Sequence, residues 1–190
     1  NGTVIVTGSI DLTGTKLPEL PRFGMRMELH QPYENLTYYG RGPFENYIDR
    51  YSGAFIGRYE DKVENQFYWY IRPQETGNKT DVRWLTLLDS GGLGVKITGL
   101  QPISFSALHF SPEDLDPGLT RKLQHTIDIV PQKNIFLHVD LKQRGLGGDN
   151  SWGMYPHNEY RLLDKKYTYS YMIELVEKGS DKNDYLNSRK

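Results

Sequence analysis

The residues best suited to chemistry in this chain lie in the glycine-rich stretch QRGLGGDNSWGMYP, residues 143–156. Trp152 follows Asp149 and Asn150 there, and the side chains of these two residues can bond back to the backbone. The indole could project outward and stack on the C–H face of a sugar ring. It could equally fold back and cover a sheet. The residues alone leave both arrangements open.

Two further polar stretches offer side chains that could bind a ligand. YYGRGPFENYIDR, residues 38–50, surrounds a glycine and proline turn with polar groups, and YIRPQETGNKTDVRW, residues 70–84, carries amides and carboxylates before a strand. Such groups hydrogen-bond sugar hydroxyls, but they also brace loops through ion pairs and backbone capping. The candidate ligand-binding residues of the two stretches are Arg41, Glu45, Asn46, Glu75 and Asn78.

Signals for catalysis are weak in this sequence. The five histidines are scattered without metal-ligand spacing, there is no cysteine, and no Gly-x-Ser-x-Gly element occurs. Glu45 and Glu75 could form a glycosidase carboxylate pair, but the sequence gives no distance between them. We therefore expect no catalytic residue and no metal site in this chain.

The composition argues for a polar β-protein. The 190 residues suffice for one domain with a core, and the 14 tyrosines favour strands. A formal net charge of -1 argues against nucleic acid or an anionic membrane as the main partner. No apolar stretch approaches the roughly 20 residues that span a bilayer. The opening NGTVIV carries no Met, so we expect a piece of a longer protein.

Alternating apolar and polar residues predict strands along most of the chain. In residues 135–142, Leu137 and Val139 face one side, whereas His138 and Asp140 face the other, toward solvent. In residues 167–175, alternate positions from Tyr167 to Leu175 share an apolar face. The expected strands cover residues 3–12, 24–30, 36–40, 66–71, 82–89, 94–99, 103–110, 123–130, 135–142 and 167–175.

The sequence predicts few turns and helices. Ser111 as N-cap and Pro112 at the first helical position predict a helix of one or two turns, ended by Pro117 and Gly118. Residues 59–66 are a weaker helical candidate, and SGG at residues 90–92 predicts a hairpin. The connection that carries Trp152 runs for about fifteen residues, long enough to indicate function. We expect Trp152 to be partly exposed.

Three stretches taken together carry a resemblance to a known family. GRGPFENYIDR, YIRPQETGNKTDVRW and QRGLGGDNSWG resemble, in order and rough spacing, the C-terminal domain or small chain of the bacterial β-galactosidases of glycoside hydrolase family 2. The resemblance covers residues 1–178 and leaves 179–190 as a C-terminal tail. It implies an all-β antiparallel supersandwich similar in fold to galactose mutarotase. The family's domain starts further upstream, so the resemblance also implies an N-terminally truncated domain with missing edge strands.

The same resemblance implies a division of labour within a larger enzyme. Both catalytic glutamates of the family lie in a (β/α)8 barrel outside this domain, and Trp152, with Asn150 and Asp149, would help to form the galactoside site at the mouth of that barrel. The family uses Mg and Na in its other domains, so no cofactor is expected here. It also implies a homo-oligomeric parent in the cytoplasm or periplasm of a bacterium. The alternatives are an independent carbohydrate-binding module and an aldose 1-epimerase-like enzyme.

Overall fold

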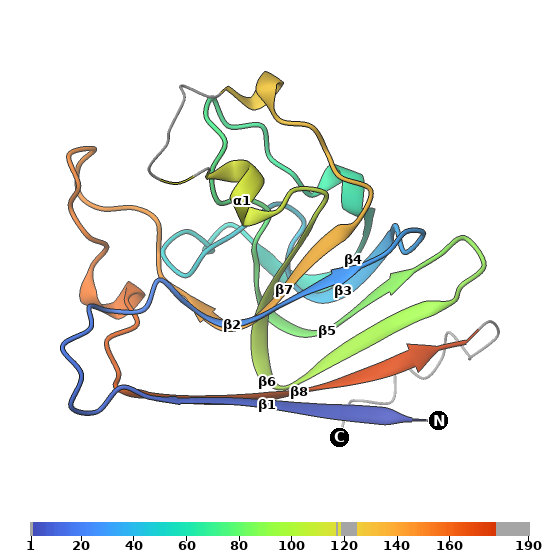
Figure 1. The fold of residues 1–190 in the computed structure, drawn as a ribbon, viewed down its shortest axis with the longest axis horizontal. Helices are drawn as coiled ribbons and strands as arrows, with labels where there is room; N and C mark the ends of the chain where they lie inside the picture. The colour runs from blue at the N-terminus through green and yellow to red at the C-terminus, as the bar shows by residue number, and fades with distance from the viewer. Residues whose placement is uncertain (1, 117, 119–124, 178–190) are drawn as a thin grey trace.

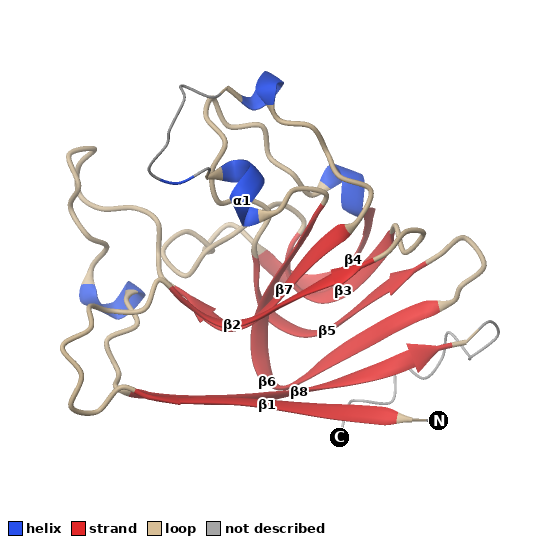
Figure 2. Ribbon diagram, in the orientation of Figure 1, coloured by secondary structure: helices blue, strands red, loops and turns tan. Residues whose placement is uncertain are grey.

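The computed structural model describes residues 2–116, 118 and 125–177, in which the strands join into one antiparallel sheet of eight strands. Figure 1 shows the course of the chain, and Figure 2 separates the strands from the loops at their ends. The strands are β1 (Thr3–Asp11), β2 (Arg22–Leu29), β3 (Asn35–Gly42), β4 (Phe55–Lys62), β5 (Lys79–Leu88), β6 (Gly94–Leu108), β7 (Ile135–Gln143) and β8 (Lys166–Val176). The helical elements are α1 (Pro112–Leu115) and the 3-10 turns η1 (Val63–Asn65), η3 (Thr126–Asp128) and η4 (Asn158–Tyr160).

The long strand β6 curls the sheet into a sandwich. Its first part, Gly94–Gly99, pairs with β8, and its last part, Ser104–Leu108, pairs with β7. The order β1-β8-β6-β5-β3-β4 therefore forms one path, and β7 and β2 branch from the far end of β6. Figure 1 shows β2 and β7 on one side of the fold and β1 and β8 on the other.

The core fills the space between these two sides. Buried side chains of β3, β5, β6, β7 and β8 form one cluster, and Phe23 of β2 packs against it. The Tyr169 hydroxyl on β8 donates a 2.9 Å hydrogen bond to the Val139 carbonyl on β7. β7 and β8 are not paired in the sheet, so this bond shows that the two strands face each other across the core. The all-β antiparallel prediction is confirmed.

A smaller cluster packs beneath the helix α1. It consists of Phe67, Leu108, Phe110, Leu115 and Ile129. Ser111 caps the helix as predicted, since its hydroxyl oxygen accepts a 3.1 Å hydrogen bond from the Asp114 amide. The helix is one turn long and ends at Leu115. The predicted stop at Pro117 lies outside the described residues, as does the tail at 179–190.

Two predicted strands and one predicted helix are wrong. Residues 66–70 form no regular element, because the Tyr68 amide bonds to the Thr76 hydroxyl and the Tyr70 amide bonds back to the Tyr68 carbonyl instead of to a neighbouring strand. The predicted strand at 123–130 contains the 3-10 turn η3 in its described part. Residues 59–62 belong to β4 and leave a 3-10 turn in place of a helix, since they pair with β3.

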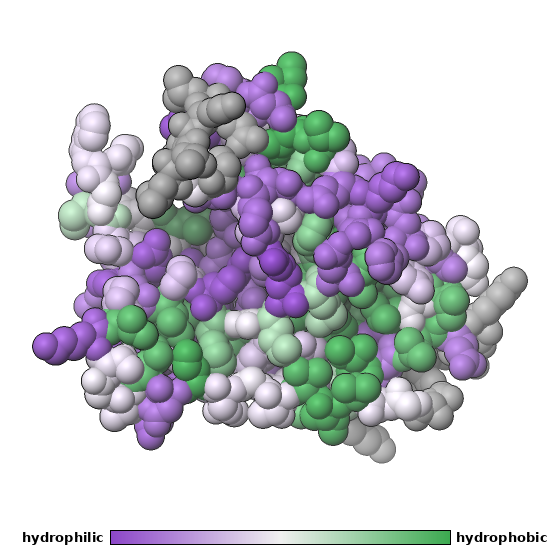
Figure 3. Space-filling model, viewed as in Figure 1, coloured by the Kyte–Doolittle hydropathy of each residue, from purple (hydrophilic) through white to green (hydrophobic). Residues whose placement is uncertain are grey.

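The alternation on two confirmed strands also breaks. Asp140, expected toward solvent, is fully buried, because β2 pairs with β7 and brings Arg22 over that face. Leu175, expected in the core, is 72% exposed near the end of β8. Figure 3 shows apolar side chains gathered on the surface over β1, where Val4 and Ile5 are also exposed. β1 and β4 end the main path of the sheet; the mutarotase likeness and the missing edge strands stay predictions.

No helix in the described part of the chain is long and apolar enough to cross a membrane.

Candidate functional site

The connection between β7 and β8, residues 144–165, stands out from the sheet at the left of Figures 1 and 2. Trp152 lies near its tip and is 91% exposed, which confirms the prediction that its indole is not buried. Met154 and Tyr155 are also more than half exposed. The loop therefore presents an uncovered aromatic surface, flanked by a thioether and a phenol ring.

Local hydrogen bonds shape the tip of this loop. The Asn150 Oδ1 accepts a 2.8 Å bond from the Trp152 amide, and Gly153 supplies the turn with φ +97°. The Asp149 carboxylate lies 2.8 Å from the Nε2 of His157 and raises the pKa of that imidazole through this bond. Asp149 and Asn150, predicted as substrate ligands, thus both hold the turn from which Trp152 projects.

An ion-pair hub fixes the base of the loop. The buried carboxylate of Glu19 pairs with Arg144 at 2.9 Å and with Arg161 at 2.5 Å, so one acidic group joins the two ends of the connection. Both guanidinium groups also lie over the ring of Tyr155, at 5.5 and 4.8 Å from its centroid. The Gly145 amide donates to the Tyr160 carbonyl at 2.8 Å. The sequence reasoning missed Glu19, which stands in no motif.

Glu45 is an anchor for the loop that follows Tyr70. One of its oxygens accepts a 2.7 Å hydrogen bond from the Gly77 amide and a 3.0 Å hydrogen bond from the Thr76 hydroxyl. The other oxygen accepts a 2.7 Å hydrogen bond from Arg50 and a further one from the Tyr70 hydroxyl. Burial alone would raise its pKa, but these donors together hold the pKa below the usual value. Both oxygens are thus engaged within the chain.

Asn46 and Asn78 form a buried amide pair beside Glu45. The Asn46 Oδ1 accepts from the Thr80 amide at 2.9 Å and from the Thr80 hydroxyl at 2.5 Å. Its Nδ2 donates to the Arg41 carbonyl near the end of β3 and to the Phe44 carbonyl of its own loop, each at 3.1 Å. The Asn78 Nδ2 donates to the Asn46 carbonyl at 2.8 Å. The structure thus brings Glu45, Asn46 and Asn78 together, where they join the two polar stretches.

Arg41 and Glu75, the remaining predicted ligand residues, contact different partners. The Arg41 guanidinium contacts Asp81 at 2.5 Å, donates to the Ala54 carbonyl at 3.0 Å and covers the ring of Tyr51. Glu75 lies 3.5 Å from Arg22, and burial raises the pKa of its carboxyl. Neither residue contacts Trp152 among the interactions of the described residues.

A buried ionic cluster behind Glu75 was also missed by the sequence reasoning. Arg22 of β2 donates to Gln143 at 2.8 Å and lies 2.9 Å from the carboxylate of Asp140. Burial raises the pKa of Asp140 to about 7, against the opposing effect of the Arg22 charge. Gly24 makes this approach possible, since a Cβ there would lie 1.9 Å from the Asp140 Oδ1. The β2–β7 register shifts at this point.

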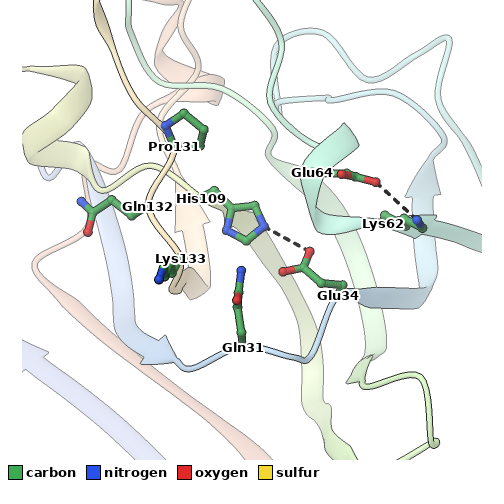
Figure 4. Close-up of a pocket in the computed structure, with 8 residues that line it drawn as sticks. All are labelled: Gln31, Glu34, Lys62, Glu64, His109, Pro131, Gln132 and Lys133. Carbon is green, nitrogen blue, oxygen red and sulfur yellow. Dashed lines mark hydrogen bonds and ion pairs between the residues drawn. The ribbon is translucent and has the colours of Figure 1, made fainter.

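A hollow of about 490 Å³ is lined by none of the predicted site residues. Figure 4 draws the residues that line it. His109 lies between the Glu34 carboxylate, 3.1 Å from its Nε2, and the Asn134 carbonyl, 3.1 Å from its Nδ1. Lys62 pairs with Glu64 at the rim. The charged groups drawn there are largely paired with one another, and no residue of the Trp152 loop reaches the hollow.

The described residues include no group of three or more His, Asp or Glu side chains that could hold a metal ion. The features of the site are therefore an exposed indole, a loop fixed at its base and carboxylates that brace other loops. Such an arrangement can stack on an apolar ring face, as the indole of an exposed Trp does on a sugar.

Comparison with known proteins identifies the family. A model described as β-galactosidase small chain matches residues 2–173. The β-galactosidase of Priestia megaterium is 38% identical over 159 residues, 83% of this chain and 15% of the relative. That of Streptococcus thermophilus is 36% identical over 175 residues, 91% of this chain and 16% of the relative. That of Halalkalibacterium halodurans is 36% identical over 150 residues, 78% of this chain and 14% of the relative.

The chain spans about one sixth of the length of these relatives. The match extends over nearly the whole sequence and includes all three stretches on which the resemblance rests. The chain therefore belongs to the β-galactosidase small-chain family.

Proposed function

We propose that this chain is a non-catalytic domain of a β-galactosidase and that Trp152 provides an aromatic platform for the substrate of the whole enzyme. The observation that carries the proposal is the exposure of Trp152, 91%, on a loop whose base is fixed by the Glu19 ion pairs. An indole left in water at this position has no role in the core of the domain. The indole has a role in binding when a sugar ring, held by the remainder of the protein, covers it.

The carboxylates of the chain support the non-catalytic part of the proposal. A glycosidase needs two carboxyl groups that flank one scissile bond. Both oxygens of Glu45 accept hydrogen bonds from its own loops, and Asp140 is fully buried against Arg22. The acid and the nucleophile for hydrolysis of a β-galactoside would then come from outside these residues.

Trp152→Ala in the full-length protein tests the platform. Loss of one stacking contact should weaken disaccharide binding by about 1–2 kcal/mol, which raises KM roughly tenfold and leaves kcat for galactoside cleavage little changed. Trp152→Phe should recover part of the loss, since a smaller ring still stacks. Steady-state kinetics with lactose give both constants.

The matched control is Trp69→Ala, which removes another exposed indole that packs on Phe67 at a ring distance of 4.8 Å. It should leave KM for lactose unchanged. If Trp152→Ala and Trp69→Ala give the same KM as the parent protein, the platform is refuted.

The exposed indole also fits an independent carbohydrate-binding module. Calorimetric titration of this chain alone with galactose and lactose separates the two functions. Binding with a Kd of about 1 mM or tighter would favour a module. We expect no heat of binding, because Trp152 offers one face of a site whose other walls lie elsewhere in the enzyme.

A further inference from the structure

We propose that Asp49 is the positioning residue of Trp152. Its carboxylate, on the loop that follows β3, holds the glycine segment 145–147 of the Trp152 loop, and through that segment it fixes where the indole stands. The role deepens the proposed function and depends on it for its effect on substrate, but its effect on the loop can be measured without substrate.

The contact joins two loops nearly a hundred residues apart in the sequence. The Asp49 Oδ2 accepts a 2.7 Å hydrogen bond from the Gly147 amide. A bond from a backbone amide to a carboxylate is charge-assisted and is stronger than one between neutral groups. Of the hydrogen bonds in the described part of the chain, this one reaches nearest to the loop tip from outside the loop. Gly147 precedes the turn at Asn150 by three residues.

Two glycines of the loop, Gly145 and Gly147, lie close to this carboxylate. A Cβ on Gly145 would lie 2.7 Å from the Asp49 Cγ and 2.9 Å from its Oδ2. A Cβ on Gly147 would lie 3.3 Å from the same oxygen. The loop backbone therefore passes so close to Asp49 that a side chain at position 145 would displace the carboxylate. Flexibility is one use of glycine, but close approach is its use at this position.

Asp49 is itself held firmly enough to act as an anchor. It lies in a turn closed by a 2.8 Å hydrogen bond from the Arg50 amide to the Tyr47 carbonyl. The turn begins directly after Asn46, and the Tyr47 ring is buried under the Arg50 guanidinium. The buried amide and ion-pair cluster around Glu45 and Asn46 thus extends through Asp49 to the Trp152 loop. This gives the first polar stretch a part in the site without any contact to substrate.

The test uses the full-length protein with Asp49→Ala, Asp49→Asn and the control Glu159→Ala. Glu159 is an exposed acidic residue of the same connection. Hydrogen exchange of the peptide 144–153 reports on the loop, and lactose KM and kcat report on the site. Asp49→Ala should speed exchange of this peptide about tenfold, the effect of one lost hydrogen bond, and should raise KM with kcat unchanged. Asp49→Asn keeps a neutral acceptor and should restore part of both values.

A second variant approaches the same contact from the other loop. Gly145→Ala leaves Asp49 in the sequence but drives its carboxylate away, so it should reproduce the faster exchange and the raised KM. In a Trp152→Ala background, Asp49→Ala should raise KM no further, because it acts through the indole.

The outcomes separate this inference from the proposed function. Unchanged exchange in both Asp49→Ala and Gly145→Ala overturns the positioning role, whatever Trp152→Ala does. Faster exchange combined with a normal KM in Trp152→Ala supports the positioning role and refutes the substrate platform. An equal rise in KM with and without Trp152 shows that Asp49 acts on the site by another route and overturns the inference.

Discussion

Replacing Asn46 by alanine is expected to lower the free energy of unfolding of this chain by about 4 kcal/mol. Its amide is fully buried and takes part in four hydrogen bonds, two as donor and two as acceptor. Truncation leaves the Thr80 amide and hydroxyl without their acceptor, and two carbonyls without their donor. Each buried polar group that loses its partner costs about 1–3 kcal/mol. The expected loss for these four groups lies at the low end of that range, because water and relaxation recover part of the lost free energy.

Asn46→Asp separates the two halves of the network. The carboxylate can still accept from Thr80, but it cannot donate to the Arg41 and Phe44 carbonyls and faces them with negative charge. It should therefore be no more stable than Asn46→Ala. Guanidinium-induced unfolding gives both values. The control Asn35→Ala, at an exposed position of β3, should change stability by less than about 0.5 kcal/mol. A loss at Asn46 as small as that at Asn35 would contradict the bracing role.

The contrast between Asn46 and Trp152 shows what the sequence could reveal about the site. A tryptophan among glycines stands out, and its exposure was predicted from the length of the connection together with the resemblance to the family. Nothing in the residue types of the polar stretches distinguishes an amide that meets a sugar from one that meets a carbonyl of its own loop. That difference depends on which loops lie side by side, and the Asn46–Thr80 and Asp49–Gly147 contacts join segments 34 and 98 residues apart.

The fold was predictable where one face of a strand is buried. β3 and β8 were found because alternation reports one-sided burial. The prediction failed at residues 66–70, where aromatic side chains pack into a small cluster without a strand partner. It failed again at Asp140, because β7 is covered on both faces and alternation cannot report a second covered face.

Asp140 and His138, two positions apart on β7, are expected to give this chain two opposite responses to pH. Burial, with the nearby charges of Arg22 and Arg26, lowers the pKa of His138 from 6.5 to about 4. Burial raises the pKa of Asp140 from 3.8 to about 7, with Glu75 adding to the rise and Arg22 opposing it. The Arg22 Nε approaches the carboxylate to 2.9 Å without the alignment of a hydrogen bond, so the ion pair offsets only part of the desolvation.

The sign of each response follows from which state binds the proton more tightly. The folded state holds the Asp140 proton more tightly than the unfolded state, so stability falls as pH rises from about 4 to about 7. The unfolded state holds the His138 proton more tightly, so stability rises as pH goes from about 4 to about 6.5. At about 1.4 kcal/mol per pKa unit, the two contributions are of order 4 and 3 kcal/mol. Glu113, which faces His138, weakens the second.

Two substitutions should therefore separate the two responses. Asp140→Asn removes the contribution to stability that falls with rising pH. The stability of this variant relative to the parent chain should therefore increase as pH rises from 4 to 7. His138→Gln removes the contribution to stability that rises with pH. The stability of this variant relative to the parent chain should therefore decrease over the same pH range. Unfolding by urea at each pH unit from 4 to 8 measures both differences, and the exposed Asp164→Asn should run parallel to the parent. Parallel curves for all three variants would show that neither pKa differs between the folded and unfolded states. Opposite slopes would instead make His138 and Asp140, on the strand β7 that β2 covers, the origin of the two responses.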